Sequence, residues 1–142
     1  IQDRVPIVIG GSGERVTLRI AAELADGCNL FGDAATVARL VERLREHCAD
    51  IGRDPEEIEF GHLGSILLGS DARDVRSRIE RLRPADIGPD RFAERVNAGT
   101  VEDHEAGFGR LVEAGVRHAV VSVADVGAPD ALAPFADLIE RC

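Results

Sequence analysis

The stretch from Pro6 to Arg15 places the tightest constraint on how this chain folds. It opens with an apolar, β-branched run, Ile7 to Ile9, which is typical of a buried parallel strand. The run breaks into glycines and a serine, and a helical pattern of apolar residues then continues to about residue 25. These residues predict a strand, a tight turn and a helix in direct succession.

The turn between that strand and that helix is a candidate anion site. A turn without side chains lets several backbone N–H groups point at one position, and the positive end of the helix dipole lies behind them. We therefore expect Gly10, Gly11, Ser12 and Gly13 to bind a phosphate and Arg15 to add a charged contact. The alternative is that the glycines only permit a sharp connection. Their spacing fits neither the dinucleotide fingerprint nor a P-loop, which needs a lysine that the chain lacks.

Length and charge narrow the class of protein. A chain of 142 residues has the length of one domain, so we expect a single domain over residues 1–142. The sequence contains no run of about 18 apolar residues, so no membrane span is predicted. The net charge of −9 argues against a nucleic-acid surface, which needs a basic face. Small-molecule partners and a cytoplasmic location are the resulting expectations.

The three cysteines, Cys28, Cys48 and Cys142, predict neither a disulfide framework nor a metal site. Their number is odd and their spacing is not that of metal ligands, so a reduced compartment is expected. Cys28 has no identifiable base near it in the sequence. We interpret it as a small buried hydrophobe rather than a nucleophile.

Local signals predict the remaining elements. Asp33 is placed to cap a helix that Gly52 ends, Asp71 with Asp74 resembles a loose capping box, and Thr100 opens a helix that Gly115 closes. Gly27 is placed for a left-handed cap of the first helix. Further strands are expected at 28–32, 58–68 and 118–123, the last one buried, and further helices at 71–82, 92–96 and 129–142. In the helix after Thr100, the apolar residues expected to point inward are Phe108, Leu111 and Val112.

Strands that alternate with helices predict an α/β fold with parallel pairing. A (β/α)₈ barrel typically needs roughly 250 residues, so about four strands with flanking helices correspond to half of a TIM-type barrel. Such a half exposes two strand edges. We expect either a second copy or a missing part of the chain to cover them.

Few other residues are candidates for chemistry. His62 lies in a strand between glycines and is either an acid or base at the barrel mouth or a hydrogen-bonded structural histidine. Asn29 either contacts a ligand or forms a backbone hydrogen bond. For the three remaining histidines, His47, His104 and His118, a solvated or capping role is expected. The arginine-rich run from Arg73 to Arg83 is interpreted as a solvated helix face, and no catalytic residue is assigned.

Several stretches resemble the luciferase-like oxidoreductases, and specifically the branch that uses the deazaflavin coenzyme F420. The resemblance lies in residues 5–15, in 17–19 with 25–33, in 47–48 with 52–58 and, more weakly, in 114–121. It implies the C-terminal half of a TIM-type barrel, with the turn from Gly10 to Arg15 holding the coenzyme phosphate. The activity implied is hydride transfer between F420 and an organic substrate.

Two features depart from the family pattern. The N-terminal strands, which carry most groups that handle the ring and substrate in such enzymes, are absent, and the segment from Pro84 to Thr100 is short and irregular. An FMN-dependent luciferase-like monooxygenase is one alternative. A non-catalytic half-barrel that self-associates or binds a coenzyme is another. The expected macromolecular partner is a second copy or the missing N-terminal half of the barrel.

Overall fold

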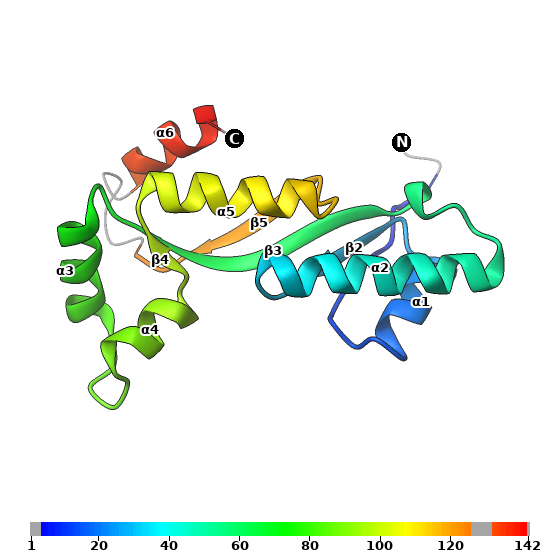
Figure 1. The fold of residues 1–142 in the computed structure, drawn as a ribbon, viewed down its shortest axis with the longest axis horizontal. Helices are drawn as coiled ribbons and strands as arrows, with labels where there is room; N and C mark the ends of the chain where they lie inside the picture. Colours follow the sequence, from blue (N-terminus) through cyan, green and yellow to red (C-terminus); the bar gives the residue numbers. More distant parts are fainter. Residues whose placement is uncertain (1–3, 126–131, 142) are drawn as a thin grey trace. The chain divides into compact units, whose positions relative to one another are not determined.

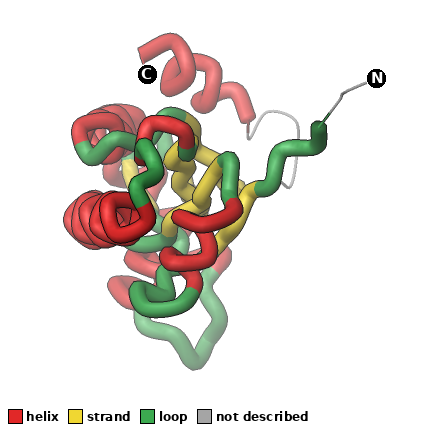
Figure 2. Tube along the Cα trace, turned by 90° about the vertical axis from the view of Figure 1, so that its right-hand side faces the viewer, coloured by secondary structure: helices red, strands yellow, loops and turns green. Residues whose placement is uncertain are grey.

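A computed structural model of the chain describes residues 4–125 and 132–141. The chain forms two compact units, residues 1–63 with 110–120 and residues 64–109 with 121–142, and each is described by itself. Strands and helices alternate along the chain except where α3 (Ala72–Leu82) and α4 (Pro89–Arg95) follow each other, as the sequence predicts for an α/β protein. Figure 2 distinguishes the helices from the strands by colour. The described residues include no helix that is both long and apolar enough to cross a membrane.

The first unit is a parallel sheet with two helices packed on it (Figure 1). Its elements are β1 (Val8–Gly10), α1 (Thr17–Leu24), β2 (Gly27–Leu30), α2 (Ala34–Ile51), a 3₁₀ turn (Pro55–Glu57), the first half of β3 (Glu59–Leu68) and the start of β5 (His118–Val123). The register aligns Val8 with Gly27 and Cys28 with Phe60, and the Arg117 N–H donates to the Phe60 carbonyl at 2.8 Å. The strand order in this unit is therefore β1, β2, β3, β5.

The apolar face of α2 forms the centre of this unit's core. Its side chains recur at helical spacing and are fully or almost fully buried: Val37, Leu40, Val41, Leu44 and Cys48. The helix ends are those that the sequence predicts. Asp33 accepts a hydrogen bond from the Thr36 N–H at 2.8 Å, and Gly52 takes the left-handed conformation with φ of 70°.

The end of α1 differs from the prediction. Gly27 is not a left-handed cap; it is the first residue of β2, where a Cβ would lie 3.3 Å from the Glu59 carbonyl oxygen. The helix instead ends at Ala25 in an extended conformation. Arg53 donates to the carbonyls of Ala22 and Ala25 at 2.8 and 2.7 Å. A distant arginine thus satisfies the terminal carbonyls that a local glycine was expected to satisfy.

The second unit contains the end of β3, α3 (Ala72–Leu82), α4 (Pro89–Arg95), β4 (Ala98–Gly99), the end of β5, α6 (Ala133–Arg141) and all of α5 (Val101–Glu113) but its last four residues. β4 pairs parallel with β3, aligning Leu67 with Ala98. Two groups of buried residues form its core, one of Ile66, Leu68, Val101 and Leu138 and the other of Leu67, Ile79, Phe92 and Val96.

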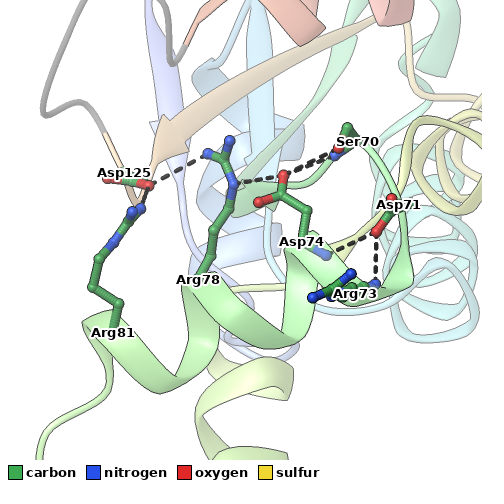
Figure 3. Close-up of polar contacts among 7 residues, drawn as sticks. All are labelled: Ser70, Asp71, Arg73, Asp74, Arg78, Arg81 and Asp125. Carbon is green, nitrogen blue, oxygen red and sulfur yellow. Dashed lines mark hydrogen bonds and ion pairs between the residues drawn. The ribbon is translucent and has the colours of Figure 1, made fainter.

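Side-chain bonds to backbone N–H groups begin both α3 and α5, and those at α5 are reciprocal. Asp71 accepts from the N–H groups of Arg73 and Asp74 at 2.7 and 2.8 Å, while Asp74 accepts from the Ser70 N–H at 3.0 Å (Figure 3). At α5, Asp103 accepts from the Thr100 N–H, and the Thr100 hydroxyl accepts from the Asp103 N–H. These bonds confirm both predicted capping motifs and lower the pKa of Asp74 and of Asp103.

The arginines of α3 correct the prediction that this helix face is simply solvated. Arg78 is only 18% exposed and binds both Asp74 and Asp125. Arg81 reaches the same Asp125 carboxylate, so two guanidinium groups of one helix converge on an aspartate two residues beyond the end of β5 (Figure 3). The cluster ties the start of α3 to the carboxyl end of β5.

Other expectations need smaller corrections. The two-residue strand β4 is not predicted, because so short an element leaves no periodicity. Val112 points outward and is 66% exposed, and β5 is largely exposed rather than buried. The helix expected at 92–96 begins earlier, at Pro89. The last helix is Ala133–Arg141; residues 129–131 and 142 of its predicted span lie outside the described residues.

Replacing Arg53 tests its role as the cap of α1. We expect Arg53→Gln to lower the free energy of unfolding by about 2 kcal/mol, because two charged hydrogen bonds to buried carbonyls are lost. Urea unfolding followed by circular dichroism measures the change. The control is Arg19→Gln, which removes an exposed pair with Glu23 and should cost at most about 0.5 kcal/mol. Equal losses in the two variants would contradict the capping role.

Candidate functional site

The glycine turn after β1 is bonded to the end of β2. The Gly11 N–H donates to the Asn29 carbonyl at 3.1 Å, and the Ser12 hydroxyl donates to the Phe31 carbonyl at 3.5 Å. Gly11 has a φ of 151°, which side chains rarely adopt. The turn therefore has a defined backbone path at the carboxyl end of β1.

Close packing against Thr17 accounts for two of the glycines. A Cβ on Gly11 would lie 2.8 Å from the Thr17 Cγ2, and one on Gly13 would lie 2.7 Å from the Thr17 Oγ1. Thr17 is the first residue of α1, so the turn and the helix meet without room for a side chain. This packing alone is a reason for the glycines, and Ser12 and Gly13 between strand and helix are exposed.

The start of α1 carries positive potential that no side chain offsets locally. Its N-cap residue, Val16, makes no side-chain capping bond, and its first turn contains no acidic residue. The nearby Glu14 carboxylate is bound by Arg39. Arg15 is exposed. These features suit an anion, and phosphate binding by the turn stays a prediction.

His47 fixes the turn from the side of α2. It is buried, and its Nε2 donates to the Glu14 carbonyl at 2.7 Å. The prediction of a solvated or capping role for His47 is wrong. Its spacing with Leu40, Val41 and Leu44 is the signal that places it on the buried helix face.

His62 lies beside the loop that follows β2. Its Nε2 donates to the Gly32 carbonyl at 3.0 Å, whereas its Nδ1 is enclosed and has no hydrogen-bond partner among the described residues. The bond to Gly32 favours the structural interpretation. Because Phe31 and Gly32 are neighbours, His62 and Ser12 bond to adjacent carbonyls of one loop.

A polar cluster that the sequence interpretation missed joins three strands of the first unit. The His118 Nε2 lies 3.2 Å from the Asn29 Oδ1, and its Nδ1 lies 3.2 Å from the Glu59 Oε1. Gly61 lies between them, and a Cβ there would approach these two side chains to 2.1–2.3 Å. The Asn29 side chain thus bonds to a side chain, not to the backbone. The register of Asn29 with Gly61 is the signal that identifies this cluster.

The second unit holds a buried histidine at the start of α5. His104 is 4% exposed, and its Nε2 has no partner in the described part of the chain. Burial lowers its pKa, against smaller raising effects of a hydrogen bond with the Leu67 backbone and of the Asp103 carboxylate. His104 is therefore a neutral core residue. The prediction that it is a solvated or capping group is wrong.

The cysteines of the first unit are inert. Burial raises the pKa of Cys28 to about 11, and burial also raises the pKa of Cys48. Both thiols are fully buried, so the interpretation of Cys28 as a small hydrophobe fits the structure.

Comparison with known families decides the class of this chain. The family model described as luciferase-like monooxygenase matches residues 1–133. The chain belongs to this family. A search of curated proteins finds no match. The resemblance stated from the sequence is thereby confirmed at the level of the family.

Solved structures show the same fold. One is an F420-dependent secondary alcohol dehydrogenase in complex with an F420-acetone adduct, with a TM-score of 0.77, 17% identity, and coverage of 99% of this chain and 49% of that chain. A second is a coenzyme F420 dependent tetrahydromethanopterin reductase from Methanopyrus kandleri, with a TM-score of 0.66 and 17% identity. The match covers 95% of this chain and 49% of the reductase. A third is a long-chain alkane monooxygenase, with a TM-score of 0.71 and 16% identity. The match covers 98% of this chain and 41% of the monooxygenase.

The luciferase-like chain thus spans about half the length of these structures or less. At such identities the likeness concerns the fold, which is that of half a TIM-type barrel. The expected fold class is confirmed. The comparisons include both F420-dependent enzymes and monooxygenases, so they establish the family and leave the coenzyme to the proposal below.

Gly61 offers a direct test of the three-strand cluster. We expect Gly61→Ala to lower the free energy of unfolding by about 1–3 kcal/mol, because the added methyl group forces Asn29 and His118 apart. Chemical denaturation measures the loss. Gly107→Ala is the matched control, since no atom lies near a Cβ at Gly107 within α5 and alanine favours a helix. A neutral Gly61→Ala would contradict the packing.

The buried His104 predicts a pH dependence of stability. Because its pKa is lowered in the folded chain, the unfolded chain binds a proton that the folded chain does not. The free energy of unfolding therefore falls as the pH drops below the ordinary value of 6.5. We expect His104→Gln to show a smaller decrease than the wild type between about pH 7.5 and 5.5. Thermal unfolding at both pH values measures it, and parallel decreases would refute the assignment.

Proposed function

We propose that this chain is part of an F420-dependent oxidoreductase of the luciferase-like family and binds the coenzyme phosphate with the turn from Gly10 to Arg15. The observation that carries the proposal is the start of α1. It is a helix N-terminus without a side-chain cap or an acidic first turn, and it lies directly behind a turn that contains Gly10, Gly11 and Gly13.

The position of the turn in the fold supports the proposal. In TIM-type barrels, ligands bind at the carboxyl ends of the strands. The turn directly follows the last residue of β1, Gly10, and its Gly11 and Ser12 bond to the chain at the end of β2. Two of the similar structures, the alcohol dehydrogenase and the tetrahydromethanopterin reductase, are of F420-dependent enzymes.

The residues of this chain have a binding role in the proposed reaction. The bound deazaflavin supplies the hydride chemistry. Backbone N–H groups of the turn hold the phosphate, Arg15 adds a charged contact, and His47 keeps the Glu14 carbonyl turned toward α2. Arg39 holds the Glu14 carboxylate, whose charge opposes an anion. No catalytic residue is assigned to this chain.

FMN is the alternative coenzyme. It also carries a phosphate, and the fold is shared with a long-chain alkane monooxygenase and with a riboflavin lyase solved with modified FMN. Under this alternative the same turn binds the phosphate. Only the ring system and the chemistry differ.

A titration with F420 and with FMN tests the proposal. We expect saturable binding of F420, and we expect Arg15→Gln to weaken it about tenfold, because one charged hydrogen bond to phosphate is lost. Arg19→Gln is the matched control, since Arg19 lies one turn further along the same exposed helix and pairs with Glu23. Coenzyme fluorescence gives the affinities.

Three outcomes decide the assignment. F420 binding that is equally strong in Arg15→Gln and in a Gly11→Val variant shown by circular dichroism to be folded would refute the turn as the site. Preferential binding of FMN would replace F420 by the alternative. No binding of either coenzyme would contradict the proposal that this chain holds the phosphate by itself.

A further inference from the structure

One glycine of the turn after β1 has no packing reason to be a glycine. A Cβ on Gly11 or Gly13 would collide with Thr17, whereas the nearest described atom to a Cβ on Gly10 is the Phe31 Cζ, at an ordinary contact distance of 3.9 Å. The φ of Gly10 is not positive either. The backbone at position 10 therefore accepts a side chain, and the glycine leaves an open space beside the Phe31 ring.

This space lies on one defined face of the sheet. Gly10 is aligned with Asn29, and aligned residues of parallel strands point to the same face. The neighbours of Asn29 in β2, Cys28 and Leu30, are fully buried on the opposite face. Because side chains alternate along a strand, Phe31 follows Asn29 on the face of Gly10, and its contact with Gly10 agrees with this. Gly10 and Phe31 thus share one face, at the carboxyl ends of β1 and β2.

The Phe31 side chain is open to solvent, although its backbone is bonded to the turn. The Ser12 hydroxyl donates to the Phe31 carbonyl, while 38% of Phe31 is exposed. Small-molecule sites combine apolar or aromatic surface with a few polar groups. An aromatic ring supplies a large apolar area for such contacts. A single exposed phenylalanine is common, but this one adjoins both an open space and a candidate anion site.

The surface around the space is apolar with one neutral polar neighbour. Val8 precedes Gly10 by two residues, so it lies on the same face, and it is 54% exposed. A Cβ on its aligned partner Gly27 would lie 3.4 Å from a Val8 methyl group, which confirms this orientation. Asn29 is uncharged, and its Oδ1 faces the His118 Nε2. Such surroundings suit a carbon chain or a ring rather than a second anion.

We propose that Phe31 and the space at Gly10 bind the organic group attached to the phosphate that the turn holds. The inference rests on the proposed function, because the turn from Gly10 to Arg15 supplies the phosphate site. It deepens that function by naming the ligand class, a phosphate ester whose carbon chain or ring contacts Phe31. Inorganic phosphate fills the turn alone. Phe31 is thus a specificity-determining residue, whichever coenzyme binds.

A comparison of two probes, inorganic phosphate and phenyl phosphate, tests the inference. We expect the wild type to bind phenyl phosphate about tenfold more tightly, because the phenyl group buries apolar area against Phe31. Phe31→Ala should reduce this preference to about twofold and leave the affinity for inorganic phosphate unchanged. Gly10→Val fills the space and should also lower the preference. NMR titrations that follow the backbone N–H signals of residues 11–13 give the affinities.

Leu24→Ala is the matched control. Leu24 is also an exposed apolar residue, at 60%, but it is the last residue of α1, whereas the turn precedes the first. The preference for phenyl phosphate should therefore persist in this variant.

The outcomes separate this inference from the proposed function. A preference that persists in Phe31→Ala would overturn the inference and leave the turn as the phosphate site. Equal affinities of the wild type for the two probes, or equal weakening of both by Phe31→Ala, would also overturn it. No binding of either probe to the wild type would overturn the phosphate site itself, and the inference with it. Circular dichroism checks that each variant is folded; if Phe31→Ala is not, Gly10→Val decides.

Discussion

Backbone hydrogen bonding to β3 is the interaction on which the rest of the structure depends. β2, β4 and β5 all pair with this strand, so every described strand except β1 contacts it directly. A parallel ladder satisfies N–H and C=O groups that would otherwise be buried at high cost. The caps of α3 and α5 follow from it, because Ser70 lies two residues after the end of β3 and Thr100 comes directly after β4.

Sequence reasoning succeeds where one residue determines a local conformation. Asp33, Gly52 and the pair Thr100 with Asp103 mark helix ends through bonds made within a few residues. The order of the main strands and helices also follows from periodicity, and the half-barrel follows from their number. These are the parts of the fold that need no distant partner.

Sequence reasoning fails where a residue's hydrogen-bonding or packing partner is distant in the chain. Arg53 caps α1 across 28 residues from Ala25, and His118 meets Asn29 across 89. Gly27 looks like a cap locally, yet β-pairing takes it into a strand. The solvent exposure of β5 is of the same kind, because burial of a strand depends on what lies on its other side. For the candidate turn, Thr17 gives the glycines a packing reason that spacing alone does not reveal.

Asn29, Gly61 and His118 pack closely, so the substitutions that each of these positions accepts in evolution depend on the other two. Because the two side chains both occupy the space above Gly61, a larger residue there requires that positions 29 and 118 both give way first. The order of substitutions is then constrained, and changes that are harmful singly become acceptable together. In related sequences these positions, one on each of three neighbouring strands, should vary as a set.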